Sequence, residues 1–195
     1  MSRTAEIRRT TKETDVYVKL NLDGSGKTDI DTGIGFFDHM LDAVGRHGLF
    51  DLTVKVKGDL KVDTHHTVED TGIVLGQAIA EAVGDKKGIR RYGFSILPMD
   101  EVLSLASIDL CGRAYYSSDM TFTVPSIGEL ETETIREFFL ALANNASMNL
   151  HIKMLESGNN HHMAEVAFKA FAKALDQATS YDERITDVLS TKGSL

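Results

Sequence analysis

A short histidine motif occurs twice in this chain of 195 residues and constrains its fold more than any other feature. Residues 63–70 contain His-His-x-x-Glu, and the same spacing returns in residues 159–165. An apolar run with helical period follows each copy, so each copy is predicted to begin a helix. Two copies in one chain indicate a tandem duplication.

The spacing inside each copy predicts metal binding. Helix positions three or four apart share a face, so His65 and Glu69, or His66 and Glu69, can converge on one ion. The adjacent imidazoles point about 100° apart, so they cannot easily aim at the same ion. A lone histidine pair is more often a surface feature, but two copies with identical spacing favour ligation. We therefore predict two metal sites, each with ligands from both copies.

The other histidines supply further candidate ligands. His39 follows Asp38, whose carboxylate could orient its ring through a hydrogen bond. His47 is left over and is interpreted as a structural or helix-end residue, with substrate contact as the alternative. The predicted ligands are six histidines and two glutamates, enough for two sites of four protein ligands each: His39, His65, His66, Glu69, His151, His161, His162 and Glu165.

Ligand chemistry narrows the metal only in part. The lack of thiolate ligands disfavours structural zinc and iron–sulfur sites. Imidazole-rich sites with some carboxylate suit zinc, iron, nickel or manganese, and spare coordination positions favour six-coordinate manganese or iron. The residues alone leave these ions open.

Composition and charge bear on partners and location. A net charge of −8 argues against a nucleic-acid or anionic-membrane surface as a partner. The single cysteine, Cys111, allows no internal disulfide and is predicted to be a buried, inert thiol in a reducing compartment. The start of the chain lacks the apolar core of a signal peptide, and no apolar run reaches membrane-spanning length. We expect a cytoplasmic protein.

Apolar periodicity predicts a repeated order of elements. Strict alternation predicts strands at residues 16–22, 52–56, 102–110, 121–124 and 150–155. Helical spacing predicts helices at residues 36–47, from the first motif to residue 84, at 135–146, and from the second motif to residue 178. The fold class is therefore α+β, a two-layer sandwich of two tandem halves, 1–94 and 95–195, in which each sheet is covered by its own helix pair.

These motifs also carry a family resemblance that spans almost the whole chain. Residues 35–41, 63–70, 87–93, 109–115, 150–152 and 160–165 together resemble the imidazoleglycerol-phosphate dehydratase family of histidine biosynthesis. Cys111 and Ala114 stand where the family more often has Ser and Pro, and Thr191 stands where it usually has Ser. We expect no fused phosphatase domain of the kind found in some bacterial members.

The resemblance implies a fold, an activity and an assembly. Each half would be similar to domain 2 of ribosomal protein S5. The enzyme would be a metal-dependent hydro-lyase that converts imidazoleglycerol phosphate, a small phosphorylated imidazole, to imidazoleacetol phosphate. Two manganese ions (Mn²⁺) per active site are implied. The resemblance also implies a homo-oligomeric shell of roughly two dozen subunits, a 24-mer with active sites at subunit interfaces and metal ligands shared between chains.

The resemblance assigns substrate contacts as well. Glu13 occupies the position of the family's catalytic glutamate, although the sequence alone favours a solvated turn residue. Arg91 and Arg113 occupy phosphate positions, and guanidinium is a natural bidentate partner for phosphate. The predicted substrate-binding residues are Glu13, His47, Arg91, Arg113, Ser190 and Lys192.

Our hypothesis for the chemistry starts from the substrate's own ring, because the proton to be removed is not adjacent to a carbonyl. Metals on both ring nitrogens would hold the ring as an imidazolate, which can expel the hydroxyl from the attached carbon to give a diazafulvene-like intermediate. A carboxylate then removes the neighbouring proton, and the enol tautomerises to the ketone. Glu13 is the first candidate for that carboxylate, and Glu69 and Glu165 are the other catalytic candidates.

Two alternatives remain open at this point. A different di-metal (manganese or iron) enzyme, such as an oxidase or hydrolase, would also use His and Glu ligands. Bundle-type oxidases, however, place Glu-x-x-His on long helices rather than His-His-x-x-Glu after strands. A non-catalytic metal-binding store or assembly protein would bind the metals without turnover.

Overall fold

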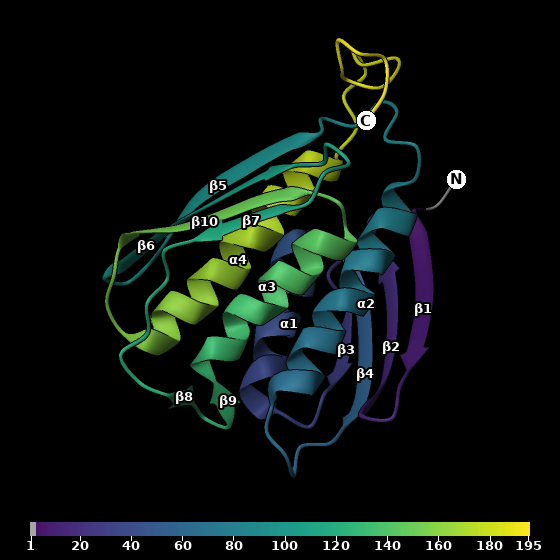
Figure 1. The fold of residues 1–195 in the computed structure, drawn as a ribbon. Helices are drawn as coiled ribbons and strands as arrows, with labels where there is room; N and C mark the ends of the chain where they lie inside the picture. Colours follow the sequence, from purple (N-terminus) through teal and green to yellow (C-terminus); the bar gives the residue numbers. More distant parts are fainter. Residues whose placement is uncertain (1–2) are drawn as a thin grey trace.

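The computed structural model describes residues 3–195 and shows two four-stranded sheets with four long helices between them (Figure 1). Each sheet carries its own helices, and the two halves meet where α2 packs on α3 and α1 packs on α4. The predicted α+β architecture of two duplicated, two-layer halves is therefore confirmed.

The two halves repeat one order of elements. The first half consists of β1 (Thr4–Thr10), β2 (Thr14–Asn21), β3 (Thr28–Asp31), α1 (Gly35–Gly48), β4 (Asp51–Gly58) and α2 (His65–Val83). The second half consists of β5 (Tyr92–Met99), β6 (Val102–Asp109), β7 (Tyr115–Ser118), α3 (Thr132–Asn145), β10 (Asn149–Glu156) and α4 (Asn160–Thr179), with a small β8 (Ser126–Ile127) and β9 (Leu130–Glu131) hairpin before α3. Because β5 begins at Tyr92, the second sheet starts inside the range 1–94.

The two sheets also share one topology. Their strand orders are β1-β2-β4-β3 and β5-β6-β10-β7. In each sheet the first three strands of that order pair antiparallel, and the last strand is parallel to its neighbour. This equivalence lets each residue of one half be compared with a counterpart in the other.

Buried aromatic rings fasten the helices to one another. Phe37 of α1 and Phe168 of α4 both pack on Phe138 of α3, each with ring centroids 5.3 Å apart. The ring centroids of Phe139 and Phe168 are 4.7 Å apart. Full burial of such a side chain is worth about 1.5–3 kcal/mol relative to exposure, so these rings hold the two halves as one core.

One predicted strand is wrong, and six observed strands were missed. Within the described part of the chain, residues 121–124 form no strand, because the Thr123 N–H donates to the Asn160 side chain at 2.8 Å and Pro125 follows directly. The missed strands are the edge strands of the two four-stranded sheets, β1, β3, β5 and β7, and the two-residue strands β8 and β9. The predicted burial of Cys111 is confirmed, at 1% exposure.

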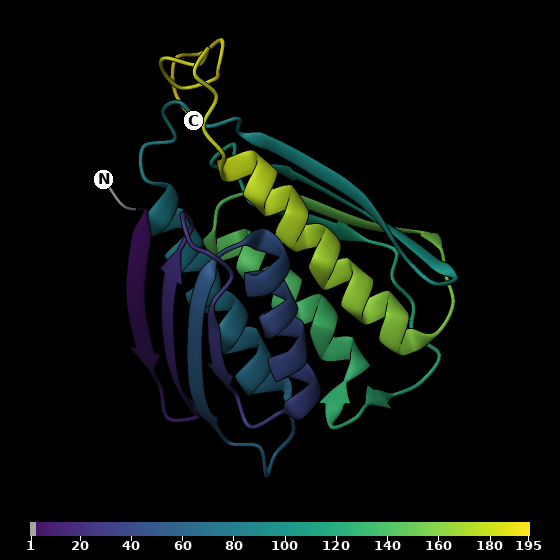
Figure 2. The same ribbon diagram turned by 180° about the vertical axis from the view of Figure 1, so that it is seen from behind.

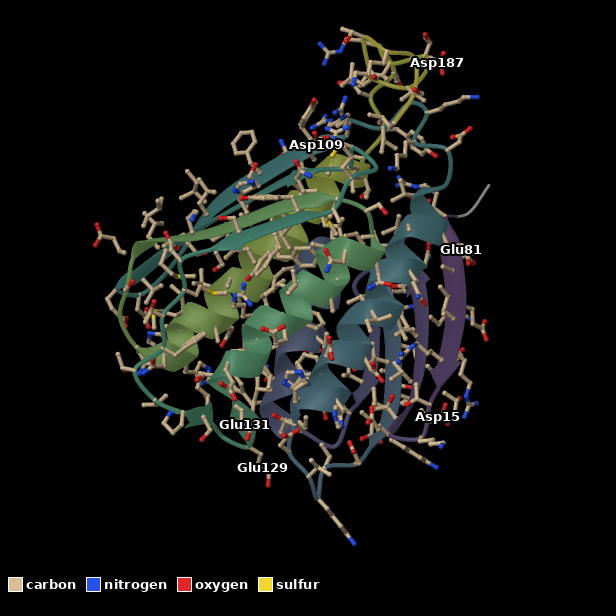
Figure 3. The ribbon with its side chains drawn as sticks, in the orientation of Figure 1. Asp15, Glu81, Asp109, Glu129, Glu131 and Asp187 are labelled. Atoms are coloured by element: carbon tan, nitrogen blue, oxygen red, sulfur yellow. The ribbon has the colours of Figure 1, made fainter. Side chains whose placement is uncertain are left out.

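The helices α2 and α4 run from one end of the molecule to the other, as both ribbon views show (Figures 1 and 2). We call the end where they start, at His65 and His161, the histidine end. The opposite end, formed by residues 84–91 and the C-terminal residues 180–195, is the tail end. Figure 3 places Glu131 toward the first and Asp109 and Asp187 toward the second.

The close approach of α2 and α3 depends on glycine, which gives a stability prediction. A Cβ added at Gly72 would lie 2.5 Å from the carbonyl oxygen of Phe138. We expect Gly72→Ala to lower the free energy of unfolding by about 1–3 kcal/mol despite its better helix propensity. Gly35→Ala is the control, since that Cβ meets nothing within 4 Å. Equal denaturant midpoints for the two variants would contradict this account of the helix contact.

Candidate active site

The second motif forms a cluster with a histidine from the first half. Glu165 Oε2 lies 3.0 Å from His161 Nε2 and 3.2 Å from His39 Nε2. The three ligand atoms lie within 4.8 Å of one another. The helix positions explain the arrangement, because His161 and Glu165 are four residues apart on α4, and α1 packs against that face and brings His39.

Glu165 is the centre of this cluster. It is 7% exposed, and Lys169 Nζ contacts its other oxygen at 2.6 Å. Burial opposes its ionisation, but hydrogen bonds from Lys169, His161 and His39 outweigh burial and lower the pKa of Glu165 to about 2. A buried, ionised carboxylate with two imidazole nitrogens beside it is a donor set that fits a divalent cation such as Mn²⁺, Fe²⁺ or Zn²⁺.

The first motif has a similar arrangement with a longer contact and a more exposed glutamate. His65 Nε2 lies 3.6 Å from Glu69 Oε2 at the start of α2. In both copies the adjacent imidazoles diverge, with interplanar angles of 85° for His65–His66 and 88° for His161–His162. In each copy, therefore, the first histidine faces the motif glutamate, while the second histidine faces elsewhere.

The second histidines meet carboxylates from outside the motifs. His66 Nδ1 lies 3.0 Å from Asp59 Oδ2, and this hydrogen bond raises the pKa of His66. His162 Nδ1 lies 3.0 Å from Glu101 Oε2 in the β5–β6 turn. The pKa of Glu101 falls to about 2, first because it accepts the Asn159 N–H and then because it bonds His162.

Glu13 lies beside the first motif. It occupies the β1–β2 turn, and its Oε1 is 3.9 Å from His66 Nε2. Its side chain is 55% exposed. The structure thus brings the predicted acid/base next to a predicted metal ligand from a distant part of the chain.

His151, His47 and Asp38 take other positions. His151 lies on the outer face of the second sheet, where its ring centroid is 5.5 Å from that of Tyr115 on β7. His47 lies in the last turn of α1, and burial followed by the charge of Lys169 lowers its pKa. Asp38 accepts hydrogen bonds from the Thr32 N–H and hydroxyl, so the predicted Asp38–His39 bond is wrong.

The predicted phosphate contacts gather at the tail end. Arg91, Arg113, Ser190 and Lys192 line one pocket of about 810 Å³. The C-terminal segment is held in this position by backbone hydrogen bonds to residues 84–91, which connect the two halves. Among them, the Gly88 N–H donates to the Asp187 carbonyl and the Asp182 N–H donates to the Gly88 carbonyl. The C-terminal residues 184–195 therefore form one wall of a cationic pocket.

Arg91 has protein partners in this pocket. Its Nε and one terminal nitrogen donate to the two oxygens of Asp109 at 2.7 and 3.0 Å, and the other terminal nitrogen donates to the Leu189 carbonyl at 2.7 Å. A guanidinium carries five N–H groups, so two remain for a ligand. Arg91 both orders the tail and keeps free donors.

Sequence reasoning missed several polar residues of the histidine end. Asp59, Asp100, Glu101 and Lys169 all lie within 4 Å of a motif residue. The duplication itself carried a signal for one of them. Glu101 follows Glu13 by 88 positions, the same separation that relates Ser104 to Val16. An alignment of the two halves therefore identifies Glu101 as the counterpart of the candidate acid/base Glu13.

The fold and these clusters define a duplicated α+β protein whose polar site residues stand at the starts of equivalent helices. Known proteins share this organisation. A family model described as imidazoleglycerol-phosphate dehydratase matches residues 32–175. Proteins of that name from Lachnoclostridium phytofermentans and Acetivibrio thermocellus are 59% and 56% identical over 195 residues, covering all of this chain and all of each relative.

Solved structures agree with this match. The crystal structure of imidazoleglycerol-phosphate dehydratase from Pyrococcus furiosus aligns with a TM-score of 0.83 at 36% identity, over 97% of this chain and 100% of that one. The Staphylococcus aureus enzyme gives the same TM-score and identity over 92% and 99%. The chain belongs to the imidazoleglycerol-phosphate dehydratase family. It is an enzyme, a hydro-lyase of histidine biosynthesis. None of the helices in residues 3–195 has the length and apolar character needed to span a bilayer.

Proposed function

We propose that this chain removes water from imidazoleglycerol phosphate to give imidazoleacetol phosphate, using two manganese ions per active site. The observation that carries the metal dependence is the cluster of His39, His161 and Glu165, which joins ligand atoms from both halves within 4.8 Å. Family membership supports the substrate and the reaction. A biosynthetic role of this kind also supports a cytoplasmic location.

The metal ligands would come from all the predicted histidines and both motif glutamates. His39, His161 and Glu165 would hold one ion, and His65 with Glu69 would contribute in a similar arrangement from the first copy. His66 and His162 would contribute through their Nε2 atoms. The ions would supply Lewis acidity that stabilises negative charge on the bound azole ring.

Glu13 is the residue we assign to proton transfer. The elimination breaks a C–O bond on the carbon attached to the ring and a C–H bond on the next carbon. The expelled hydroxyl leaves as water once it gains a proton, and the enol O–H group releases a proton as the ketone forms. Glu13 would accept the carbon-bound proton and return a proton during ketonisation. Its exposed carboxylate near His66 supports this role, because a general base must reach a substrate held at the metal site.

The phosphate would bind in the cationic pocket at the tail end. Arg113, Ser190, Lys192 and the free donors of Arg91 would satisfy its oxygens. This pocket is far from the histidine end of the same chain. The Arg91 N–H bonds the Ala178 carbonyl near the end of α4, which places it about 26 Å along the helix from His161 at 1.5 Å per residue.

That separation supports a homo-oligomer with shared active sites. A glycerol phosphate chain places its ring and phosphate less than about 10 Å apart, so one chain cannot hold both ends of the substrate. In our proposal a second chain supplies one of them. The outer face of the second sheet offers an apolar contact surface, with exposed Tyr92, Phe94 and Ile96 on β5 and exposed Tyr115 beside His151. His151 would become a ligand for a neighbouring chain's metal site, in a shell of roughly two dozen subunits.

An activity assay after metal removal tests the proposal. The chelated protein is expected to lose ketone formation from imidazoleglycerol phosphate, and added Mn²⁺ is expected to restore it. Full activity in the chelated, metal-free protein would contradict the metal dependence. Dioxygen consumption or ester hydrolysis in place of ketone formation would support the other di-metal enzymes. Metal-dependent assembly without turnover would support a non-catalytic role.

Arg113 provides a separate test of the phosphate assignment. We expect Arg113→Ala to raise KM by about ten- to hundredfold, because a charge-assisted hydrogen bond to phosphate is lost. Manganese content should stay unchanged, since Arg113 is not among the predicted metal ligands. Arg136→Ala, on exposed α3 surface, is the control for loss of a positive charge. A variant that loses manganese while keeping its KM would refute the assignment.

A further inference from the structure

We propose that Glu101 is a positioning residue for His162, and that Asp59 has the same role for His66. Each carboxylate would hold the Nδ1–H of its histidine, so that the Nε2 lone pair stays available to a metal ion. This inference rests on the proposed metal-dependent function. It concerns which nitrogen of each second histidine is the ligand atom and what fixes that choice.

The two contacts are alike in geometry although they come from different elements. Asp59 follows β4 and contacts His66 Nδ1 at 3.0 Å, and Glu101 in the β5–β6 turn contacts His162 Nδ1 at 3.0 Å. In neutral imidazole one nitrogen carries the proton and the other carries the lone pair. A carboxylate can only accept, so each pair favours the tautomer with its proton on Nδ1. Such partners orient metal-binding histidines and raise their basicity.

Other groups besides His162 hold the Glu101 side chain in place. Its Oε1 accepts the Asn159 N–H at 2.6 Å, and Asn159 in turn caps the start of α4. The backbone also packs against this carboxylate, since a Cβ at Gly158 would lie 2.4 Å from Oε1. Glu101 therefore links the turn, the helix start and the ring of His162 in one rigid arrangement.

Comparison of the two halves explains why only one of the paired turn glutamates remains for chemistry. Glu101 stands 88 positions after Glu13, in the equivalent turn. In the first half Asp59 holds His66, which leaves Glu13 exposed and 3.9 Å from Nε2. In the second half the turn glutamate itself holds His162. The duplicated carboxylate has thus become a positioning group in one copy and stays free for proton transfer in the other.

Amide substitutions separate this role from a general effect of charge. In Glu101→Gln the amide oxygen would still accept the Asn159 N–H, which turns the NH₂ group toward His162 and favours the opposite tautomer. Among residues 3–195, both carboxylate oxygens of Asp59 contact His66 and no other group, at 3.0 and 3.2 Å. In Asp59→Asn the amide oxygen can therefore turn to the ring and keep the tautomer. Asp59→Ala removes the acceptor.

The experiment measures ring tautomers and manganese binding in the full-length assembled protein. Histidine labelled with nitrogen-15 reports the protonated ring nitrogen, and titration with Mn²⁺ reports affinity at each site. We expect Glu101→Gln to invert the His162 tautomer. The affinity for one manganese ion should fall by about 10–100-fold, and the affinity for the other should not change. The manganese affinity of Asp59→Asn should stay within about threefold of the wild-type value, and Asp59→Ala should lose as much affinity as Glu101→Gln does. Glu133→Gln, exposed on α3, is the surface control.

The outcomes distinguish the inference from the function on which it rests. Unchanged tautomer and affinity in Glu101→Gln would overturn the positioning role, and so would an equal loss at both sites with a lower melting temperature. If Glu101→Gln does not assemble, Asp59→Ala compared with Asp59→Asn carries the same test on His66. A wild-type protein that binds no manganese would refute the proposed function instead, while the ring measurement would still decide the tautomers.

Discussion

Replacement of Glu13 by glutamine is expected to lower kcat by about 10²–10⁴-fold, the usual contribution of a general acid or base. The substitution keeps the size of the side chain but removes its ability to accept a proton. Because Glu13 lies 3.9 Å from His66 and is not a predicted ligand, manganese content and substrate binding should persist. The measurement is kcat of the manganese-loaded variant, together with metal analysis.

Glu6→Gln is the matched control for Glu13, since Glu6 is an exposed carboxylate on β1 in the same half. It should turn over at the wild-type rate. A Glu13→Gln enzyme that binds manganese and substrate yet turns over normally would remove Glu13 from the mechanism. Loss of metal along with activity would instead place Glu13 among the ligands.

Replacement of Glu165 by glutamine is expected to weaken manganese binding at its cluster by at least about 100-fold. Loss of a residue that only hydrogen-bonds to a metal ligand already lowers metal affinity by about 10–100-fold, and Glu165 is itself a proposed ligand. Glu165 Oε2 is the atom that His39 and His161 share, and the neutral amide would leave Lys169 without its counter-charge. Dehydration should be lost with the metal.

The control for this second variant is Glu156→Gln, which neutralises an exposed carboxylate at the end of β10. Metal content is measured by elemental analysis after dialysis against a fixed concentration of Mn²⁺. Full manganese occupancy in Glu165→Gln would show that this carboxylate is not a ligand. An unfolded variant is recognised by its circular dichroism and would be replaced by Glu165→Asp.

Whether a strand can be predicted from the sequence depends on its position in the sheet. The central strands β2, β4, β6 and β10 were all predicted, because buried side chains alternate along all or part of each of them. The edge strands lack this pattern. In β1 only Ala5 is fully buried, and in β5 the large residues Tyr92, Phe94 and Ile96 face outward.

The site was predictable where its geometry is local. His161 and Glu165 meet because they are four residues apart on one helix, and the divergence of adjacent histidines follows from the helical repeat. The contacts of His39 with Glu165 and of Glu101 with His162 depend on packing between elements. The separation of 88 residues identifies Glu101 as the counterpart of Glu13, but it does not predict the contact with His162. Residues that come from another chain, such as the proposed partner of His151, lie beyond any pattern within one copy.

In the proposed enzyme, the histidine end of one chain and the tail end of another form a single active site. Co-assembly of His161→Ala chains with Arg113→Glu chains tests it directly, since each variant alone should be nearly inactive. Random mixing in equal amounts should restore activity to roughly a quarter of the wild-type value, because roughly that fraction of sites receives both native residues. Mixed assemblies that stay as inactive as the separate variants would show that both residues must lie on the same chain.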